Sequence, residues 1–344
     1  MPTKKQHIVH ISGVQQFKAC REAWNWSSPQ RGNLTPVDKY APFFTGSMVH
    51  HCLEHWYKFG TPTDQAISDF CSANLTRAEF ETPTIQEQVY LVLGMMKHYH
   101  LWQKYNQSWL ADREFAFIAN EQDFSVPLWG NSRHQVKLKG TFDGVVKSLH
   151  NGKLYLWEIK TTRSIIERLK QTDLDAQTDA YLNGAERVLG VEIAGIVYTI
   201  LRKKVPEVKV LKSGDLSQAI DKDMTPEWYL NTIKEHHKEL GANKDYIKAQ
   251  YGDTLNALLS QENRYFARVV VNRSKAALAD SWRQLQIVAQ AMIDPRTPIY
   301  RSESNACNYC LFRTPCIAKR DGEDYKAILA KGYEAKKRYL DEIE

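Results

Sequence analysis

Two carboxylates and one ammonium group accompany apolar runs in the segment GTFDGVVKSLHNGKLYLWEIKTT, residues 140–162. Asp143 lies near its start, and Glu158 and Lys160 come directly after the run LYLW. Two carboxylates that converge on one point repel each other unless a cation lies between them, and hard oxygen ligands suit Mg²⁺ or Mn²⁺. The ammonium could orient or deprotonate a water, or stabilise charge that develops on a phosphate. These residue types suit hydrolysis of a phosphodiester, whereas the simpler interpretation is a salt bridge between Asp143 and Lys160.

A tight hairpin would bring these groups together. The pair Asn151-Gly152 is a strong signal for a two-residue turn of type I′. In that register Asp143 lies directly opposite Lys160 and is a diagonal neighbour of Glu158. Because side chains alternate with period two, we expect all three on one face of the hairpin. Diagonal neighbours lie about 7–8 Å apart at the backbone, which allows both carboxylates to reach one ion.

Apolar periodicity predicts an α/β fold. Apolar runs predict strands over residues 114–119, 135–149, 153–161 and 193–201. Spacings of three and four predict helices over residues 47–57, 64–80, 85–110 and 173–189, the last closed by Gly190, and a mainly helical stretch over 226–293. We expect one domain, 1–344, made of a helical part (47–110), an α/β core (112–205), a second helical part (226–295) and a cysteine-rich tail (301–320).

The composition is that of an ordinary globular protein. The chain has 344 residues, of which 43% are hydrophobic and 25% are charged, enough for a large core. A formal charge of +6 permits a polyanionic partner without requiring one. The first residues, MPTKKQHIVH, lack the apolar centre of a secretory signal, and the most apolar window, residues 89–96, is too short to span a bilayer. We therefore expect a cytoplasmic protein with no membrane partner.

Four short motifs in order resemble the RecB-type branch of the PD-(D/E)XK nucleases. That branch reads G-x-x-x-H, G-x-x-D, E-x-K and Q-x-x-x-Y, which here correspond to Gly46–His50, Gly140–Asp143, Glu158–Lys160 and Gln177–Tyr181. The proline of the superfamily name is absent, because Phe142 precedes Asp143. The resemblance implies a restriction-endonuclease-like core with a mixed sheet and large helical insertions. It also implies a Mg²⁺- or Mn²⁺-dependent deoxyribonuclease, most plainly an exonuclease, that acts on DNA ends or single strands in recombination, repair or CRISPR-type processing.

The resemblance assigns roles to individual residues. It makes His50, Asp143 and Glu158 metal ligands, with the carbonyl of Ile159 as a fourth, and Lys160 the catalytic lysine. Gln177 and Tyr181, one turn apart on a predicted helix, would line the site and meet the DNA.

Three cysteines within ten residues, Cys307, Cys310 and Cys316, require a fourth ligand if they hold a metal, and Cys20 is the leading candidate. This pattern resembles the iron–sulfur clasp of the AddB nuclease domain and of the CRISPR-associated RecB-like nucleases, in which four thiolates hold a [4Fe–4S] cluster. A Cys₄ zinc site is the chemical alternative, and unliganded cysteines are the simplest one.

Other patterns favour different functions. His51, Glu54 and His55 read H-x-x-E-H, the signature of inverted zinc metalloproteases, with Glu54 as the base. A nucleic-acid-binding module that has lost catalysis is a further alternative. The sequence has no phosphate-binding loop of an NTP-driven motor, so unwinding would need a separate helicase or recombination protein, and the oligomeric state stays open. Basic and aromatic residues could contact phosphates and stack on bases; they are Arg163, Arg202, Lys203, Lys204, Arg264, Arg268, Arg273, Lys275, Trp24, Trp26 and Tyr265.

Overall fold

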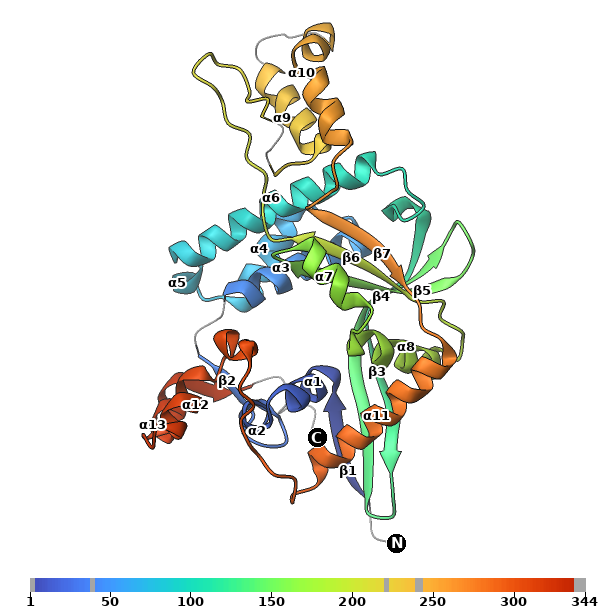
Figure 1. Ribbon diagram of the computed structural model, residues 1–344, viewed down its shortest axis with the longest axis vertical. Helices are drawn as coiled ribbons and strands as arrows, with labels where there is room; N and C mark the ends of the chain where they lie inside the picture. The colour runs from blue at the N-terminus through green and yellow to red at the C-terminus, as the bar shows by residue number, and fades with distance from the viewer. Residues whose placement is uncertain (1–3, 38–40, 220–222, 239–243, 337–344) are drawn as a thin grey trace.

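One mixed sheet organises the chain. The computed structural model describes residues 4–37, 41–219, 223–238 and 244–336. Six strands form the sheet in the order β1-β4-β5-β6-β7, with β3 paired to β4 off this path. The strands are β1 (Lys5–His10), β3 (Phe115–Gly130), β4 (His134–Ser148), β5 (Leu154–Thr162), β6 (Ile196–Arg202) and β7 (Phe266–Val271). Figure 1 shows β3 and β4 as a long ribbon that extends beyond β5, β6 and β7, with β1 beside its outer part. Parallel and antiparallel pairs occur together, which confirms the predicted mixed α/β fold.

Strand β4 has one partner along one edge and two successive partners along the other. On the first edge, β3 pairs with it in antiparallel orientation over most of its length. On the second edge, β1 pairs in parallel with residues 134–139, and β5 pairs in antiparallel orientation with residues 144–147. Residues 140–143, which read GTFD, lie between these two partners. A change of strand partner opens a crevice in a sheet, and such a crevice is a common place for a ligand.

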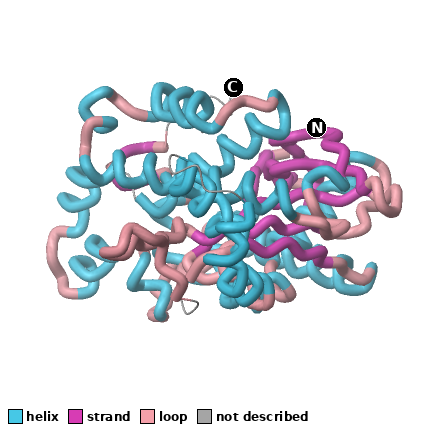
Figure 2. The backbone as a smooth tube through the Cα atoms, turned by 90° about the horizontal axis from the view of Figure 1, so that it is seen from above, coloured by secondary structure: helices cyan, strands magenta, loops and turns pink. Residues whose placement is uncertain are grey.

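Helices cover both faces of the sheet. Three helices pack with the apolar side chains of one face, among them Trp157: α3 (Ala41–Phe59), α4 (Thr63–Asn74) and α6 (Pro83–Tyr105). Three others pack on the opposite face, around Phe142 and Leu156: α1 (Ile11–Ala19), α8 (Ala176–Leu189) and α11 (Lys275–Ile293). In Figure 2 the strands are flanked by helices on both sides. The sheet is therefore the middle layer of the protein.

Two groups of elements lie outside these layers. Helices α9 (Pro226–Lys238) and α10 (Lys244–Leu259) share a small core of their own at the top of Figure 1. The second group joins segments from both ends of the chain: α2 (Arg21–Ser27), β2 (Leu34–Pro36), α12 (Arg313–Arg320), α13 (Tyr325–Gly332) and β8 (Tyr333–Ala335). The remaining elements are α5 (Arg77–Phe80), α7 (Ile165–Thr172) and two short 3-10 helices, Asp112–Glu114 and Asn305–Tyr309.

The connection between β4 and β5 differs from the predicted two-residue turn. The backbone N–H of Ser148 donates to the carbonyl of Lys153 at 2.9 Å, so the loop spans residues 149–152. A type I′ turn needs positive φ at both central residues, but in this loop only Gly152 adopts it, with φ of +72°. The predicted register is wrong by two residues, and Asp143 does not lie opposite Lys160. The predicted shared face is wrong as well. Asp143 contacts His50 of α3, on the side of the sheet where Trp157 packs. Glu158 and Lys160 contact Gln177 of α8, on the side of Phe142 and Leu156.

Other differences reflect long-range pairing. Strand β1 was not predicted, and β7 lies inside the stretch predicted to be mainly helical. Both are edge strands whose partners lie far away in sequence, so local periodicity alone carries little signal for them. The predicted helix 64–80 is divided, because Thr76 and Glu79 form a capping box that starts α5. None of the helices in the described part of the chain has the length and apolarity that a membrane crossing needs.

Candidate active site

Asp143 lies where β4 parts from β5. Its Oδ2 accepts a hydrogen bond of 2.7 Å from the backbone N–H of Ile159. Its Oδ1 lies 3.4 Å from Nδ1 of His50, which α3 supplies. Strand β5 and helix α3 thus each contact one oxygen of the Asp143 carboxylate. The Asp143 side chain is only 12% exposed.

Helix α3 approaches the sheet closely at Gly46, one turn before His50. A Cβ atom at position 46 would lie 3.3 Å from Oγ1 of Thr161 on β5. A larger side chain would push the helix away from the strand, and the imidazole of His50 would move away from Asp143 with it. The G-x-x-x-H spacing therefore has a physical reason in this protein.

Gln177 on α8 joins the two charged residues of β5. Nζ of Lys160 donates to Oε1 of Glu158 at 2.5 Å and to Oε1 of Gln177 at 3.0 Å. Nε2 of Gln177 donates to the same Glu158 oxygen at 3.1 Å. Asp175 caps α8 by accepting a hydrogen bond from the backbone N–H of Gln177 at 2.9 Å, which positions the first turn of the helix. Three of the predicted site residues thus form one hydrogen-bonded group.

Burial and crowding shift the pKa values of the acids in opposite directions. Burial first, and then the charge of Asp143, raise the pKa of Glu158 from 4.5 to about 7. Burial also disfavours ionised Asp143, but His50 and Lys160 outweigh it and lower the pKa of that carboxyl. In the same way, burial opposes the charged forms of Lys160 and His50, but the nearby carboxylates raise both pKa values. The cations of the site therefore stabilise ionised Asp143, and the repulsion between the two carboxylates is expressed in the raised pKa of Glu158.

A further acid, Glu121 on β3, joins this group and was not predicted from the sequence. Ligand atoms of His50, Glu121 and Asp143 all lie within 4.8 Å of one another. The pKa of Glu121 is raised to about 7 by its partial burial and by Asp143. Its φ of +45° lies in the left-handed region, which costs energy for a residue other than glycine. The sequence prediction ended this strand at residue 119, and only the pairing of β3 with β4 brings Glu121 to the site.

Tyr181 lies beneath the site as part of the core. Its side chain is 8% exposed, and its ring meets those of Phe124 and Phe142 edge-on at 5.8 and 5.5 Å. Gly140 makes this packing possible, because a Cβ atom there would lie 2.6 Å from the Phe124 ring and 3.3 Å from that of Tyr181. The first residue of the G-x-x-D motif is therefore a packing requirement, and Tyr181 supports the site from below.

The sequence matches one protein family over most of its length. The family model that describes the PD-(D/E)XK nuclease superfamily matches residues 11–317, which include every residue of the site described above. The chain belongs to the PD-(D/E)XK nuclease superfamily. No curated protein matches the sequence. Among solved structures, a protein named "Putative exonuclease" from Eubacterium rectale is similar at 9% identity and a TM-score of 0.33, with 79% of this chain and 87% of that chain covered.

The four predicted cluster cysteines of this nuclease lie near one another, where the two ends of the chain meet. Cys20, Cys310 and Cys316 border the same apolar cluster. The Sγ of Cys20 accepts from the backbone N–H of Ser302 at 3.5 Å, and the Sγ of Cys307 donates to the carbonyl of that same serine at 3.7 Å. Among the described residues, two groups of three potential ligands lie within 4.8 Å, and neither includes a cysteine. Four sulfurs around one zinc ion would lie only about 3.8 Å apart, given Zn–S bonds of about 2.3 Å.

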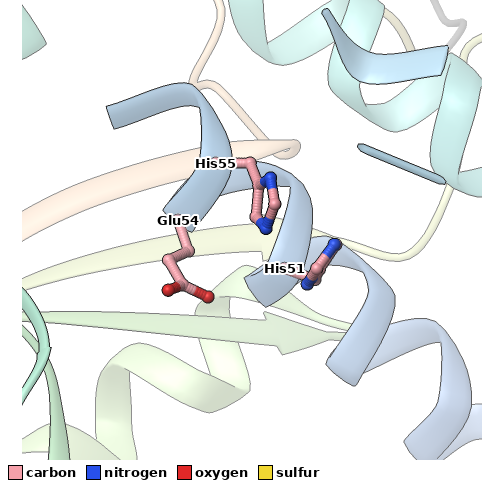
Figure 3. Close-up of side chains that lie close together, drawn as sticks. All are labelled: His51, Glu54 and His55. Carbon is pink, nitrogen blue, oxygen red and sulfur yellow. The ribbon is translucent and has the colours of Figure 1, made fainter. Parts of the chain in front are cut away.

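The H-x-x-E-H motif lies on α3, and its two histidines face away from the nuclease site. Ligand atoms of His51, Glu54 and His55 lie within 4.8 Å of one another, and the two imidazole rings are 4.1 Å apart. Figure 3 shows the two rings on one side of the helix and the Glu54 carboxylate turned toward the strands. His51 contacts Phe70 of α4, whereas His50 contacts Asp143. The two histidines are thus separate from the group around Asp143, whereas the charge of Glu54 contributes to the raised pKa of Glu121.

Several residues that the sequence suggested as DNA contacts are buried in the nuclease. Arg268 is 8% exposed, and its guanidinium pairs with Asp112 at 2.7 Å. Tyr265 and Trp24 are each 1% exposed, and Trp26 is 6% exposed. The predictions that these side chains meet phosphates or bases are wrong, because core packing and a buried ion pair already occupy them.

Proposed function

We propose that this member of the superfamily is a Mg²⁺- or Mn²⁺-dependent DNA exonuclease of the RecB/AddB-like branch. The observation that carries the proposal is the convergence of His50, Asp143, Glu158 and Lys160 at the point where β4 parts from β5. The four residues come from three elements, α3, β4 and β5. Glu158 is 2% exposed, and such burial is not expected if the acids and Lys160 form only a surface salt bridge. The acids and the lysine fit hydrolysis of a phosphodiester better than they fit simple ion pairing.

The donor set fits a hard divalent cation. The side chains of His50, Asp143 and Glu158 and the carbonyl of Ile159 would hold the ion, and Glu121 offers a further carboxylate. The raised pKa of Glu158, caused by burial and by Asp143, supports this assignment, because a cation would relieve the same repulsion. When bound, the ion would supply a water of lowered pKa and polarise the scissile phosphate.

Lys160 and Gln177 have complementary roles in this proposal. Gln177 accepts from the ammonium at 3.0 Å and donates to Glu158 at 3.1 Å, which restrains both charged side chains. Lys160, so held, would orient the attacking water and stabilise the charge that develops on the phosphate. Gln177 is therefore a positioning residue, and Tyr181 supports the helix that carries it.

A cleavage assay tests the proposal. DNA labelled at the 5′ or the 3′ end, single-stranded and double-stranded, is incubated with Mg²⁺ or Mn²⁺. We expect end-dependent degradation by the wild type and a loss of at least about a hundredfold in Lys160→Ala and Asp143→Asn. Glu54→Gln is the matched control on α3 and should keep its activity. If neither Mg²⁺ nor Mn²⁺ supports degradation of at least one of these substrates, the proposal is contradicted.

We also propose that Cys20, Cys307, Cys310 and Cys316 hold a [4Fe–4S] cluster. The four thiols come from the two ends of the chain and lie near one another. The resemblance of their spacing in the sequence to that of iron–sulfur nucleases favours a cluster over a single zinc ion. Such a cluster would close a loop of nearly the whole chain, and closing a long loop restricts the unfolded state strongly.

Metal analysis of anaerobically purified protein tests the cluster. We expect a brown protein with about four irons per chain and little zinc. Cys316→Ala should lose the colour and lower the melting temperature, whereas Cys71→Ala, a buried cysteine outside the group, should keep its iron. A colourless protein that holds one zinc would establish the Cys₄ zinc alternative instead.

The biological setting is a further part of the proposal. A nuclease of this kind would act on DNA ends or single strands in recombination, repair or CRISPR-type processing, with any unwinding supplied by a separate helicase or recombination protein. The metalloprotease alternative has one supporting observation, the proximity of His51, Glu54 and His55. Protease activity that Glu54→Gln abolishes would favour it, and DNA binding without any hydrolysis would favour a non-catalytic module.

A further inference from the structure

We infer that a basic groove at the start of β4, along the strand from the active site, binds the phosphate backbone of one strand of the DNA substrate, several nucleotides from the bond that is cut. The groove, of about 890 Å³, lies at the outer end of the β3–β4 ribbon, next to β1 and the loop that follows α2. Four basic side chains line it: Lys5, Arg31, Lys137 and Lys139. No aspartate or glutamate of the described residues does so. The inference rests on the proposed function, because it extends the substrate site of the same nuclease.

Strand β4 connects the groove to the catalytic group. Lys137, Lys139, Thr141 and Asp143 alternate along it with buried apolar residues such as Leu138. Because strand side chains alternate, these four residues lie on one face. Six residues separate Lys137 from Asp143, which corresponds to about 20 Å at about 3.3 Å per residue. The lysines are therefore placed to hold backbone at a distance from the scissile bond rather than at it.

Strand β3 borders the same surface and restricts the path along it. Ser125 lies across from Lys139 and also lines the groove. One step nearer the site, Asp123 lies across from Thr141 and accepts a hydrogen bond of 2.6 Å from its hydroxyl. The charge of Asp123 would repel a phosphate on the β3 side. A polyanion is thus expected to follow β4 and β1, where the lysines are.

The basic side chains of the groove suit the phosphate backbone of a nucleic acid. Lysines bind phosphates as point charges, without regard to sequence. At the end of the groove farther from Asp143, two imidazoles add polar groups. Nε2 of His7 lies 3.0 Å from Nδ1 of His134. Binding here would increase the affinity for strands long enough to reach the groove and would leave the chemistry at Asp143 unchanged. The groove thus predicts a preference for longer substrates.

Salt-dependent binding tests the inference. Fluorescently labelled dT₄ and dT₂₀ are titrated with the Lys160→Ala protein, which removes turnover, from 50 to 200 mM salt. For dT₂₀, Lys137→Gln/Lys139→Gln in that background should lower the slope of log K against log salt by about 1.4, since each phosphate contact to a single strand contributes about 0.7. Lys147→Gln/Lys153→Gln removes two exposed charges from the other end of the hairpin and is the matched control. Equal effects of the two pairs would overturn the inference.

A cleavage measurement separates this inference from the proposed function. With Lys160 restored, the groove pair should lose the preference of kcat/KM for dT₂₀ over dT₄, and kcat on dT₄ should stay within about twofold of wild type. If the wild type degrades no DNA but the groove pair still weakens binding, the nuclease proposal fails and the groove stands. If DNA is degraded and the groove pair behaves as the control, the groove inference fails alone. Lys5→Gln, on a different strand, gives an independent variant should the pair be poorly folded.

Discussion

The buried acid of the site gives a prediction whose size can be worked out from the structure. In the metal-free protein, Glu158 is 2% exposed and its pKa is raised from 4.5 to about 7 by burial and then by Asp143. A raised folded-state pKa means that the folded protein keeps a proton that the unfolded chain releases. The resulting stability is fully present below pH 4.5 and is lost as the pH rises through 7. A shift of this size corresponds to roughly 3 kcal/mol.

Glu158→Gln removes this dependence, because glutamine does not ionise. Relative to the wild type, we expect the free energy of unfolding of the variant to rise by roughly 2–3 kcal/mol between pH 5 and pH 8. Comparing the variant with the wild type at each pH cancels the contributions of the other titrating groups to the free energy of unfolding. One of them is His98, whose pKa burial lowers to about 3, so that it contributes stability that grows as the pH rises toward 6.5.

Urea unfolding in the presence of EDTA, followed by tryptophan fluorescence, measures the difference. Glu81→Gln changes an exposed glutamate and should follow the wild type at both pH values. Millimolar Mg²⁺ should reduce the advantage of Glu158→Gln at pH 8, because a bound cation stabilises the ionised acids. A difference between wild type and Glu158→Gln that stays constant from pH 5 to pH 8 would refute the idea that burial and Asp143 strain this carboxylate.

Three further predictions concern individual contacts. Glu121→Gln should raise the Mg²⁺ concentration for half-maximal activity about tenfold with little change in kcat at saturating metal, since the carboxylate lies within 4.8 Å of ligand atoms of His50 and Asp143; an unchanged metal requirement would exclude it as a ligand. Gly140→Ala should cost about 1–3 kcal/mol in urea unfolding, because the new Cβ would lie 2.6 Å from the Phe124 ring, and a wild-type midpoint would contradict this. Arg268→Met should destabilise the protein by about 3–5 kcal/mol by leaving the Asp112 carboxylate without its cationic partner, and a loss under about 1 kcal/mol would show that the pair is dispensable.

The sequence by itself determined the chemistry of the site and much of its local framework. The motifs carried His50, Asp143, Glu158, Lys160 and Gln177, because short-range spacing within a helix or a strand decides which side chains share a face. The predicted hairpin register was wrong by two residues, and the two acids contact helices on opposite sides of the sheet. They still meet, because Asp143 lies where β4 parts from β5 and its carboxyl accepts from the backbone N–H of Ile159, next to Glu158.

Tertiary structure alone decided the features that depend on distant pairing. Glu121 reaches the site only through the register of β3 against β4, and the groove exists only because β1, from the start of the chain, pairs beside Lys137 and Lys139. Arg268 is of a residue type that often contacts DNA, but the fold buries it against Asp112. Charge and periodicity are local properties of a sequence, whereas burial and strand partnership depend on other segments, and no local pattern records them. Those segments lie more than a hundred residues away for β1 with β4 and for Arg268 with Asp112.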